Sequence, residues 1–209
     1  MPVDVNLPRE GMIYQREQYQ KGGIGRWYWD YRDEKILERI GLEKKIVDLG
    51  CGEGILLEKL IQRFPDANVL GIDPSPENVS ICRKHGLDVY AGSAYELPLE
   101  SASVDCVLFI EVIEHLKNPE LAIREIYRVL KKEGRLILLF PNDSVFKLAR
   151  LLTFKFKEAF YDAGHVKQWH PAEMIKFLKS IGFETIYKRS LPFHLWLISL
   201  HCLITARKK

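Results

Sequence analysis

The sequence predicts an α/β protein with a Rossmann-like, doubly wound and mostly parallel sheet of seven strands, helices on both faces and an antiparallel strand near the C-terminus. Two observations lead to this prediction. Short apolar runs typical of strands alternate with amphipathic segments typical of helices, and the connections between them are short. The run at 104–110 is apolar almost throughout, as expected for a strand buried on both faces of a sheet.

The alternation can be followed along the chain. The predicted strands are 45–50, 68–73, 88–92, 104–110, 135–140 and 183–187, with a last one within 195–206. The predicted helices are one that begins at Arg32, then 55–64, 77–85, 120–130, 145–152 and one that opens at Pro171. Glycines at 41, 86, 134 and 182 stand where these helices should stop, because glycine is favoured just past a helix end.

Composition and charge exclude several classes of protein. Lys+Arg (31) and Asp+Glu (28) leave a net charge of only +3, so nucleic acid is not the favoured partner. The four cysteines have no metal-ligand spacing, so we expect no metal site and no disulfide framework. With free thiols and an N-terminus that does not read as an export signal, we expect a cytoplasmic protein. The apolar stretch 191–206 is shorter than the ~20 residues of a membrane-spanning helix, and we expect a buried strand pair there.

A glycine-rich loop at residues 47–54, Val-Asp-Leu-Gly-Cys-Gly-Glu-Gly, follows the first predicted strand. Such a loop lets a ligand approach the main chain beside a helix N-terminus. The dinucleotide-binding fingerprint GxGxxG fails, because its third glycine would be Ile55, and GxxxxGK[ST] does not occur. Asp48 would repel a pyrophosphate and suit a cation, whereas Asp73, at the end of the second strand, can accept hydrogen bonds from a ribose diol. The pattern indicates a nucleoside ligand with a nearby positive charge.

The stretch from about Lys45 to Asn142 resembles the class I S-adenosylmethionine-dependent methyltransferases, in particular the type 11 group of small-molecule enzymes. Five segments resemble the family in order: 47–54, 71–75, 92–98 with 103–105, 109–116 and 125–136. The resemblance implies S-adenosylmethionine as cofactor and S-adenosylhomocysteine as product. It also implies one domain over 1–209, with an N-terminal helical and aromatic cap (1–43), a cofactor-binding core (44–142), an insertion or substrate cap (143–170) and a C-terminal helix with strands (171–209).

The resemblance further implies a set of cofactor-binding residues: Asp48, Gly50, Cys51, Gly52, Gly54, Asp73, Pro74, Ser93, Ala94, Ile110 and Glu111. The backbone at Gly50 and Gly52 would pack against the methionine part, and Asp73 would bind the ribose hydroxyls. Ser93 stands where the family usually has an acid that pairs with the adenine amino group, and a hydroxyl accepts that bond more weakly. We expect Cys51 to be a small loop residue and not a nucleophile.

The catalytic candidates are His115 and His165. Methyl transfer is a direct displacement in which alignment is the main contribution, and a general base helps only some acceptors. Alternatively, His115 caps a turn and His165 is a structural histidine. We expect Glu114 to be exposed to solvent.

The candidates for lining the substrate site are aromatic: Tyr14, Tyr19, Trp27, Tyr161 and Trp169. The aromatic segment 27–31 is interpreted as part of a packed N-terminal helix, with a lid as the alternative. Arg26 is a candidate to hold the cofactor's carboxylate. The basic and apolar patch at 146–157 is interpreted as a cap over the site, with contact to a membrane surface as the alternative.

We therefore expect methyl transfer to a small-molecule acceptor, for which the aromatic residues favour an apolar or aromatic compound. The acceptor atom (O, N or C) and the oligomeric state stay open. The Asp/Asn-Pro-Pro-aromatic signature of base-modifying enzymes does not follow the fourth strand, which argues against a nucleic-acid acceptor. The alternatives are a regulatory module that binds S-adenosylmethionine without turnover and, less favoured, an NAD-dependent oxidoreductase.

Overall fold

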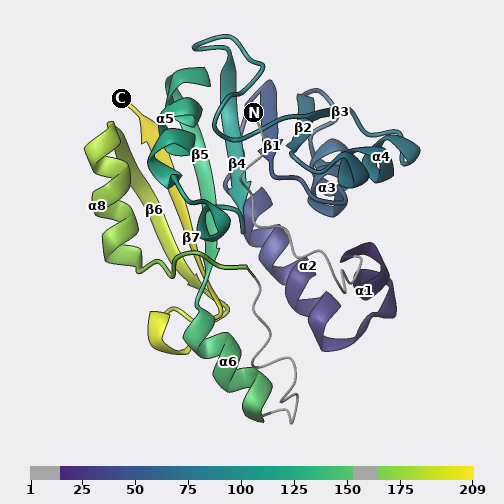
Figure 1. Ribbon diagram of the computed structural model, residues 1–209, viewed down its shortest axis with the longest axis vertical. Coiled ribbons are helices and arrows are strands. Elements are labelled where there is room, and N and C mark those ends of the chain that lie inside the picture. The colour runs from purple at the N-terminus through teal and green to yellow at the C-terminus, as the bar shows by residue number, and fades with distance from the viewer. Residues whose placement is uncertain (1–14, 153–163) are drawn as a thin grey trace.

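The computed structural model describes residues 15–152 and 164–209 (Figure 1). A seven-stranded sheet has the order β3-β2-β1-β4-β5-β7-β6. Its strands are β1 (Lys45–Leu49), β2 (Asn68–Asp73), β3 (Val89–Ala91), β4 (Val104–Ile110), β5 (Leu130–Pro141), β6 (Phe183–Leu191) and β7 (His201–Lys208). Strands β1 to β5 pair in parallel, and β7 runs antiparallel to both of its neighbours. The predicted fold class is confirmed.

The helices lie close to their predicted positions with two exceptions, α1, which was not predicted, and the start of α2. They are α1 (Gln15–Lys21), α2 (Gly23–Leu37), α3 (Ile55–Arg63), α4 (Pro76–Lys84), α5 (Pro119–Val129), α6 (Asp143–Leu152) and α8 (Pro171–Ile181). Helix α2 begins at Gly23, nine residues before the predicted start at Arg32. Glycines at 23 and 25 obscure the start of this helix, because glycine disfavours helix interiors. The aromatic segment 27–31 is therefore helical.

Two apolar cores cover the two faces of the sheet. Helices α5 and α8 pack on one face, and α2, α3 and α4 pack on the other. Strand β4 serves both cores, since Val107 and Phe109 belong to the first and Cys106 and Leu108 to the second. This alternation is the two-residue repeat of a strand buried on both sides.

The strand order reverses between β1 and β4. From β1 the chain continues outward to β2 and β3, whereas β4 continues to β5 on the other side. The chain therefore leaves β1 and β4 toward opposite sides of the sheet, and the carboxyl end of the strands at such a reversal is the usual ligand site of these sheets. Helices α1, α2 and α6 gather at this end, below the sheet in Figure 1, where β5 leads directly into α6.

The apolar stretch 191–206 differs in part from the predicted strand pair. Leu191 ends β6 and His201 begins β7, but a connection with a short 3₁₀ turn (Trp196–Ile198) lies between them. Phe193, Leu195 and Leu197 in this connection are exposed. Within the described residues, the structure contains no helix of the length and apolarity needed to cross a membrane.

Candidate active site

The glycine loop after β1 needs glycine for its backbone and for its packing. Gly50, Gly52 and Gly54 have φ angles of 79°, 55° and 80°, in the left-handed region that other residues rarely adopt. A Cβ on Gly50 would lie 2.4 Å from Cγ2 of Val112, which follows β4. The loops after β1 and β4 therefore touch at the point where the strand order reverses.

Asp73, at the end of β2, holds this loop. Its Oδ2 accepts a hydrogen bond from the Gly52 N–H at 2.8 Å. Its Oδ1 accepts from the Ser75 N–H at 2.9 Å and from Asn78 Nδ2 at 3.0 Å. A carboxylate accepts about four hydrogen bonds. Asp73 thus fixes the loop and retains room for about one further donor.

Asp48 lies beneath the loop as a buried acid. Its side chain is almost inaccessible, and Oδ2 has no hydrogen-bond partner among the described residues. The pKa of Asp48 is raised to about 7, first by burial and then by Asp33 and Asp73, while Arg32 opposes the rise. An unpaired buried carboxylate at this position favours a cationic ligand.

Glu111 links three elements at the end of β4. It accepts a hydrogen bond from Arg32 Nη1 of α2 at 2.5 Å, and its Oε1 lies 2.7 Å from His201 Nε2 of β7. Burial raises the pKa of Glu111, but Arg32 and His201 outweigh it and hold that pKa far below its usual range. The carboxylate is therefore ionised, and its backbone has the unusual φ of 55° for a residue other than glycine.

The ion pairs continue from Arg32 through α2. Arg32 Nε and Nη2 donate to Asp33 Oδ1 at 3.0 and 2.9 Å. Lys59 Nζ of α3 donates to Asp33 Oδ2 and to Asp30 Oδ1, each at 2.7 Å. The Tyr28 hydroxyl lies 2.7 Å from His201 Nδ1. These contacts, which the sequence analysis missed, fasten α2 across the carboxyl end of the sheet.

Helix α1 covers the glycine loop. The Glu53 carboxylate accepts hydrogen bonds from the backbone N–H groups of Gln15 at 2.7 Å and Arg16 at 2.8 Å. Arg16 Nε donates in return to the Glu53 carbonyl at 2.7 Å. A Cβ on Gly52 would lie 3.0 Å from Gln15 Oε1, so the first turn of α1 rests directly on the loop.

The two catalytic candidates, His115 and His165, lie together although 50 residues separate them in the sequence. Their ring centroids are 4.8 Å apart in an edge-to-face arrangement. His115 Nδ1 is 3.3 Å from the Gly164 carbonyl, and His165 Nδ1 is 2.8 Å from Asp143 Oδ1. Burial and the neighbouring His165 lower the pKa of His115, which favours its neutral form.

The expectation that Glu114 is exposed was wrong. Glu114 is only 2% exposed, because the short 3₁₀ turn Ile113–His115 directs it inward and its carbonyl accepts hydrogen bonds from the N–H groups of Val166 and Lys167. Burial first, and then Glu111 and Asp143, raise the pKa of Glu114 well above its usual range.

The aromatic candidates are dispersed. Trp169 is 3% exposed and stacks on Phe177 in the core. The Tyr19 hydroxyl donates to Asp30, and Trp27 is 61% exposed and stacks on Tyr31 of the same helix. Tyr14 and Tyr161 lie outside the described residues. Arg26 is exposed and faces Asp30 and the Tyr19 ring.

The remaining cofactor candidates differ in burial and in polar contacts. Pro74, Ser93, Ala94 and Ile110 are partly buried. The Ser93 hydroxyl accepts a hydrogen bond from the Tyr95 N–H at 3.2 Å, so it caps its own turn. Cys51 is buried, and the Cys82 thiol beside it together with burial raises its pKa, which makes it unsuited to act as a nucleophile.

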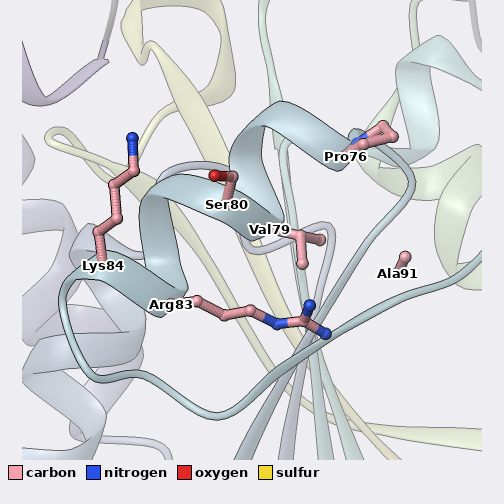
Figure 2. Close-up of a pocket in the computed structure, with 6 residues that line it drawn as sticks. All are labelled: Pro76, Val79, Ser80, Arg83, Lys84 and Ala91. Atoms are coloured by element: carbon pink, nitrogen blue, oxygen red, sulfur yellow. The ribbon is translucent and has the colours of Figure 1, made fainter.

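A separate hollow of about 480 Å³ lies between α4 and the edge strand β3 (Figure 2). It is lined by Pro76, Val79, Ser80, Arg83 and Lys84 of α4 and by Ala91 of the edge strand β3. Arg83 donates two hydrogen bonds to the Val89 carbonyl across it. Its lining residues are distinct from the candidate site at the ends of β1 and β4.

Known methyltransferases are similar to this chain in sequence and in structure. A family model described as a methyltransferase domain matches residues 47–138. A probable S-adenosylmethionine-dependent methyltransferase of Mycolicibacterium smegmatis is 30% identical over 165 residues, 75% of this chain and 60% of that protein. A ubiquinone biosynthesis O-methyltransferase of Pseudomonas aeruginosa is 36% identical over 114 residues, 49% of this chain and 47% of that protein.

This chain thus shares a methyltransferase domain, over residues 47–138, with S-adenosylmethionine-dependent methyltransferases. It spans less than two thirds of the length of these two curated relatives. A crystal structure of a SAM-dependent methyltransferase from Archaeoglobus fulgidus has the same fold, with a TM-score of 0.73, 18% identity, and coverage of 94% of this chain and 100% of that one.

The residues at the carboxyl end of the sheet fit the cofactor of this methyltransferase family. Gly50 and Gly52 allow the loop its tight turn against Val112 and Gln15, and the Asp73 carboxylate can still accept a hydrogen bond from a hydroxyl. The unpartnered oxygen of Asp48 matches the positive charge of a sulfonium compound.

Gly50→Ala is expected to destabilise the protein by more than about 2 kcal/mol, because the new Cβ would overlap Val112 and the φ of 79° is unfavourable. Gly25→Ala is the matched control, since nothing lies within 4 Å of its Cβ position and the site is helical. It should be neutral or stabilise by up to about 1 kcal/mol. Urea unfolding of both variants checks this, and equal stabilities would contradict it.

Asp48→Asn should change how stability depends on pH. The folded protein holds the Asp48 proton more tightly than the unfolded chain, with a pKa of about 7 against 3.8. Asp48 therefore makes its full contribution to the free energy of unfolding below pH about 4, and this contribution falls as the pH rises to about 7. Asn does not titrate, so the free energy of unfolding of the variant should rise by about 2 kcal/mol relative to that of the wild type between pH 5 and pH 8. Parallel pH dependences in denaturant titrations would exclude a raised pKa at Asp48.

Proposed function

We propose that the protein transfers a methyl group from S-adenosylmethionine to a small-molecule acceptor. One observation carries the proposal. The ends of β1, β2 and β4 bring together a loop with glycines at 50, 52 and 54, a carboxylate at Asp73 that fixes it, and an unpaired acid at Asp48. This combination suits a nucleoside that carries a positive charge but lacks phosphates.

The chain's own residues have separable tasks in this proposal. Gly50, Gly52 and Asp73 hold the nucleoside and methionine parts, and Asp48 supplies negative charge. S-adenosylmethionine, when bound, supplies a methyl group on a positively charged sulfur that a nucleophile can displace. Helix α1, fastened by Glu53, shields the loop from water. Alignment of the two reactants within such a shielded site can supply several kcal/mol of the rate enhancement.

We assign His115 and His165 to the acceptor side. Because Nδ1 of each faces an oxygen that can only accept, both imidazoles donate from Nδ1 and keep the Nε2 lone pair when neutral. Such lone pairs can interact with the acidic proton of an acceptor. The names of two relatives, a ubiquinone biosynthesis O-methyltransferase and a 2-methyl-6-phytyl-1,4-hydroquinone methyltransferase, support phenolic acceptors as the first to test.

The cofactor part of the proposal is tested by calorimetric titration with S-adenosylmethionine, S-adenosylhomocysteine and NAD in parallel. The first two should bind, and Asp73→Asn should weaken them at least about tenfold, because a charge-assisted hydrogen bond is lost. The exposed Asp66 provides the control variant Asp66→Asn, which should bind as the wild type does. Binding of NAD instead, or of neither sulfur compound, would overturn the proposal.

The transfer itself is tested with isotopically labelled S-adenosylmethionine and a panel of catechols, hydroquinones, amines and carbon acids. Label in an acceptor establishes the enzyme and its acceptor atom. Binding of the cofactor with no transfer across the panel would favour the regulatory module instead.

A further inference from the structure

Glu114, His115 and His165 form a cluster of metal-ligating side chains beside the candidate cofactor site. One potential ligand atom from each residue lies within 4.8 Å of the other two. Two ligands at about 2.1 Å from one ion in a tetrahedral site are about 3.4 Å apart, so the widest pair needs to close by up to about 1.4 Å, within the reach of side-chain rotation. The sequence analysis expected no metal, because the cluster joins residues 114 and 115 to a histidine 50 positions later.

The buried Glu114 carboxylate is a second, independent observation that points to a ligand in this cluster. Its side chain is 98% buried, yet neither carboxylate oxygen has a hydrogen-bond partner among the described residues. A buried carboxyl group without partners costs several kcal/mol unless a cation or donor satisfies it. Its own carbonyl, in contrast, accepts two hydrogen bonds from Val166 and Lys167, which fix the turn.

The two histidines are oriented as metal ligands usually are. His165 Nδ1–H donates to Asp143 Oδ1 at 2.8 Å, and His115 Nδ1–H donates to the Gly164 carbonyl at 3.3 Å. Each contact fixes the tautomer that leaves a lone pair on Nε2, the arrangement in which a carboxylate or carbonyl supports a metal-bound imidazole. The backbone hydrogen bonds from residues 166 and 167 to the Glu114 carbonyl hold the segment that carries His165 against the turn that carries His115.

The charge around the cluster is negative. Glu111 and Asp143 interact electrostatically with both Glu114 and His115. Glu111 is engaged by Arg32 and His201, so we do not count it as a ligand. Two imidazoles and one carboxylate select first-row divalent ions over magnesium or calcium, which prefer oxygen ligands.

We propose that Glu114, His115 and His165 bind one first-row divalent metal ion, of the zinc, manganese or cobalt type, with Asp143 as a positioning residue behind His165. Three protein ligands leave coordination positions open for an exogenous ligand. An oxygen of the methyl acceptor suits such a position, because a bound metal lowers the pKa of a hydroxyl; the ion then takes the place of the direct contact between the imidazole lone pairs and the acceptor proton. Only this assignment of the open position rests on the proposed function; the ion site itself does not.

The test uses the full chain, stripped with a chelator and titrated with Zn²⁺, Co²⁺ and Mg²⁺ in separate calorimetric experiments. We expect one Zn²⁺ or Co²⁺ per chain, weaker Mg²⁺ binding, and a ligand-field absorption band from bound Co²⁺. His165→Ala and Glu114→Gln should each weaken Zn²⁺ binding at least tenfold. Asp143→Asn should weaken it about tenfold or more, as loss of a supporting hydrogen bond does.

His194→Ala is the matched control, since His194 is exposed and lies outside the cluster. It should bind Zn²⁺ as the wild type does. If Glu114 is only a protonated buried acid, the wild type will take up no stoichiometric ion. No such uptake, or affinities unchanged in the Glu114 and His165 variants, would overturn the proposal. The same samples are titrated with S-adenosylmethionine. If the wild type binds the cofactor but no ion, only the metal site is rejected. If it binds the ion but not the cofactor, only the proposed function is rejected.

Discussion

The ion pair between Arg32 and Glu111 is the interaction on which the site depends. Glu111 follows β4 at the reversal of strand order, and Arg32 belongs to α2, which begins more than 80 residues earlier in the chain. His201 adds the first residue of β7 to the same carboxylate. Removing one partner leaves an uncompensated charge, and because the Glu111 side chain is 37% exposed, the cost is below the about 3–5 kcal/mol of a fully buried pair. The pair therefore determines where α2 lies relative to the glycine loop.

Topology explains why acids accumulate around this pair. Asp48, Asp73 and Glu111 each stand at the end of a parallel strand, and the strand ends converge at one edge of the sheet. Arg32 is the buried cation that compensates part of this charge, while Asp48 keeps an unpartnered oxygen and a raised pKa. The edge thus remains electronegative, which suits a cationic cofactor on one side and a divalent ion at Glu114 on the other.

The sequence predicted the strands and the glycine loop well, because both depend on local patterns. Strands 68–73 and 104–110 have the observed bounds, and the positive φ angles at Gly50, Gly52 and Gly54 follow from the turn that the loop must make. The long-range contacts were not predictable. No local pattern indicates that Arg32 meets Glu111, that His115 meets His165, or that a 3₁₀ turn buries Glu114. Trp169 was an aromatic candidate for the pocket, but its surroundings in the core depend on how α8 packs.

A double-mutant cycle on Arg32 and Glu111 tests the central claim most directly. The free energy of unfolding is measured for the wild type, Arg32→Met, Glu111→Gln and the double variant. If the pair organises this edge, the double variant will be more stable than the sum of the single effects predicts, by at least about 1.5 kcal/mol. Single effects that add to within about 0.5 kcal/mol would show that the two residues act independently and would contradict the account.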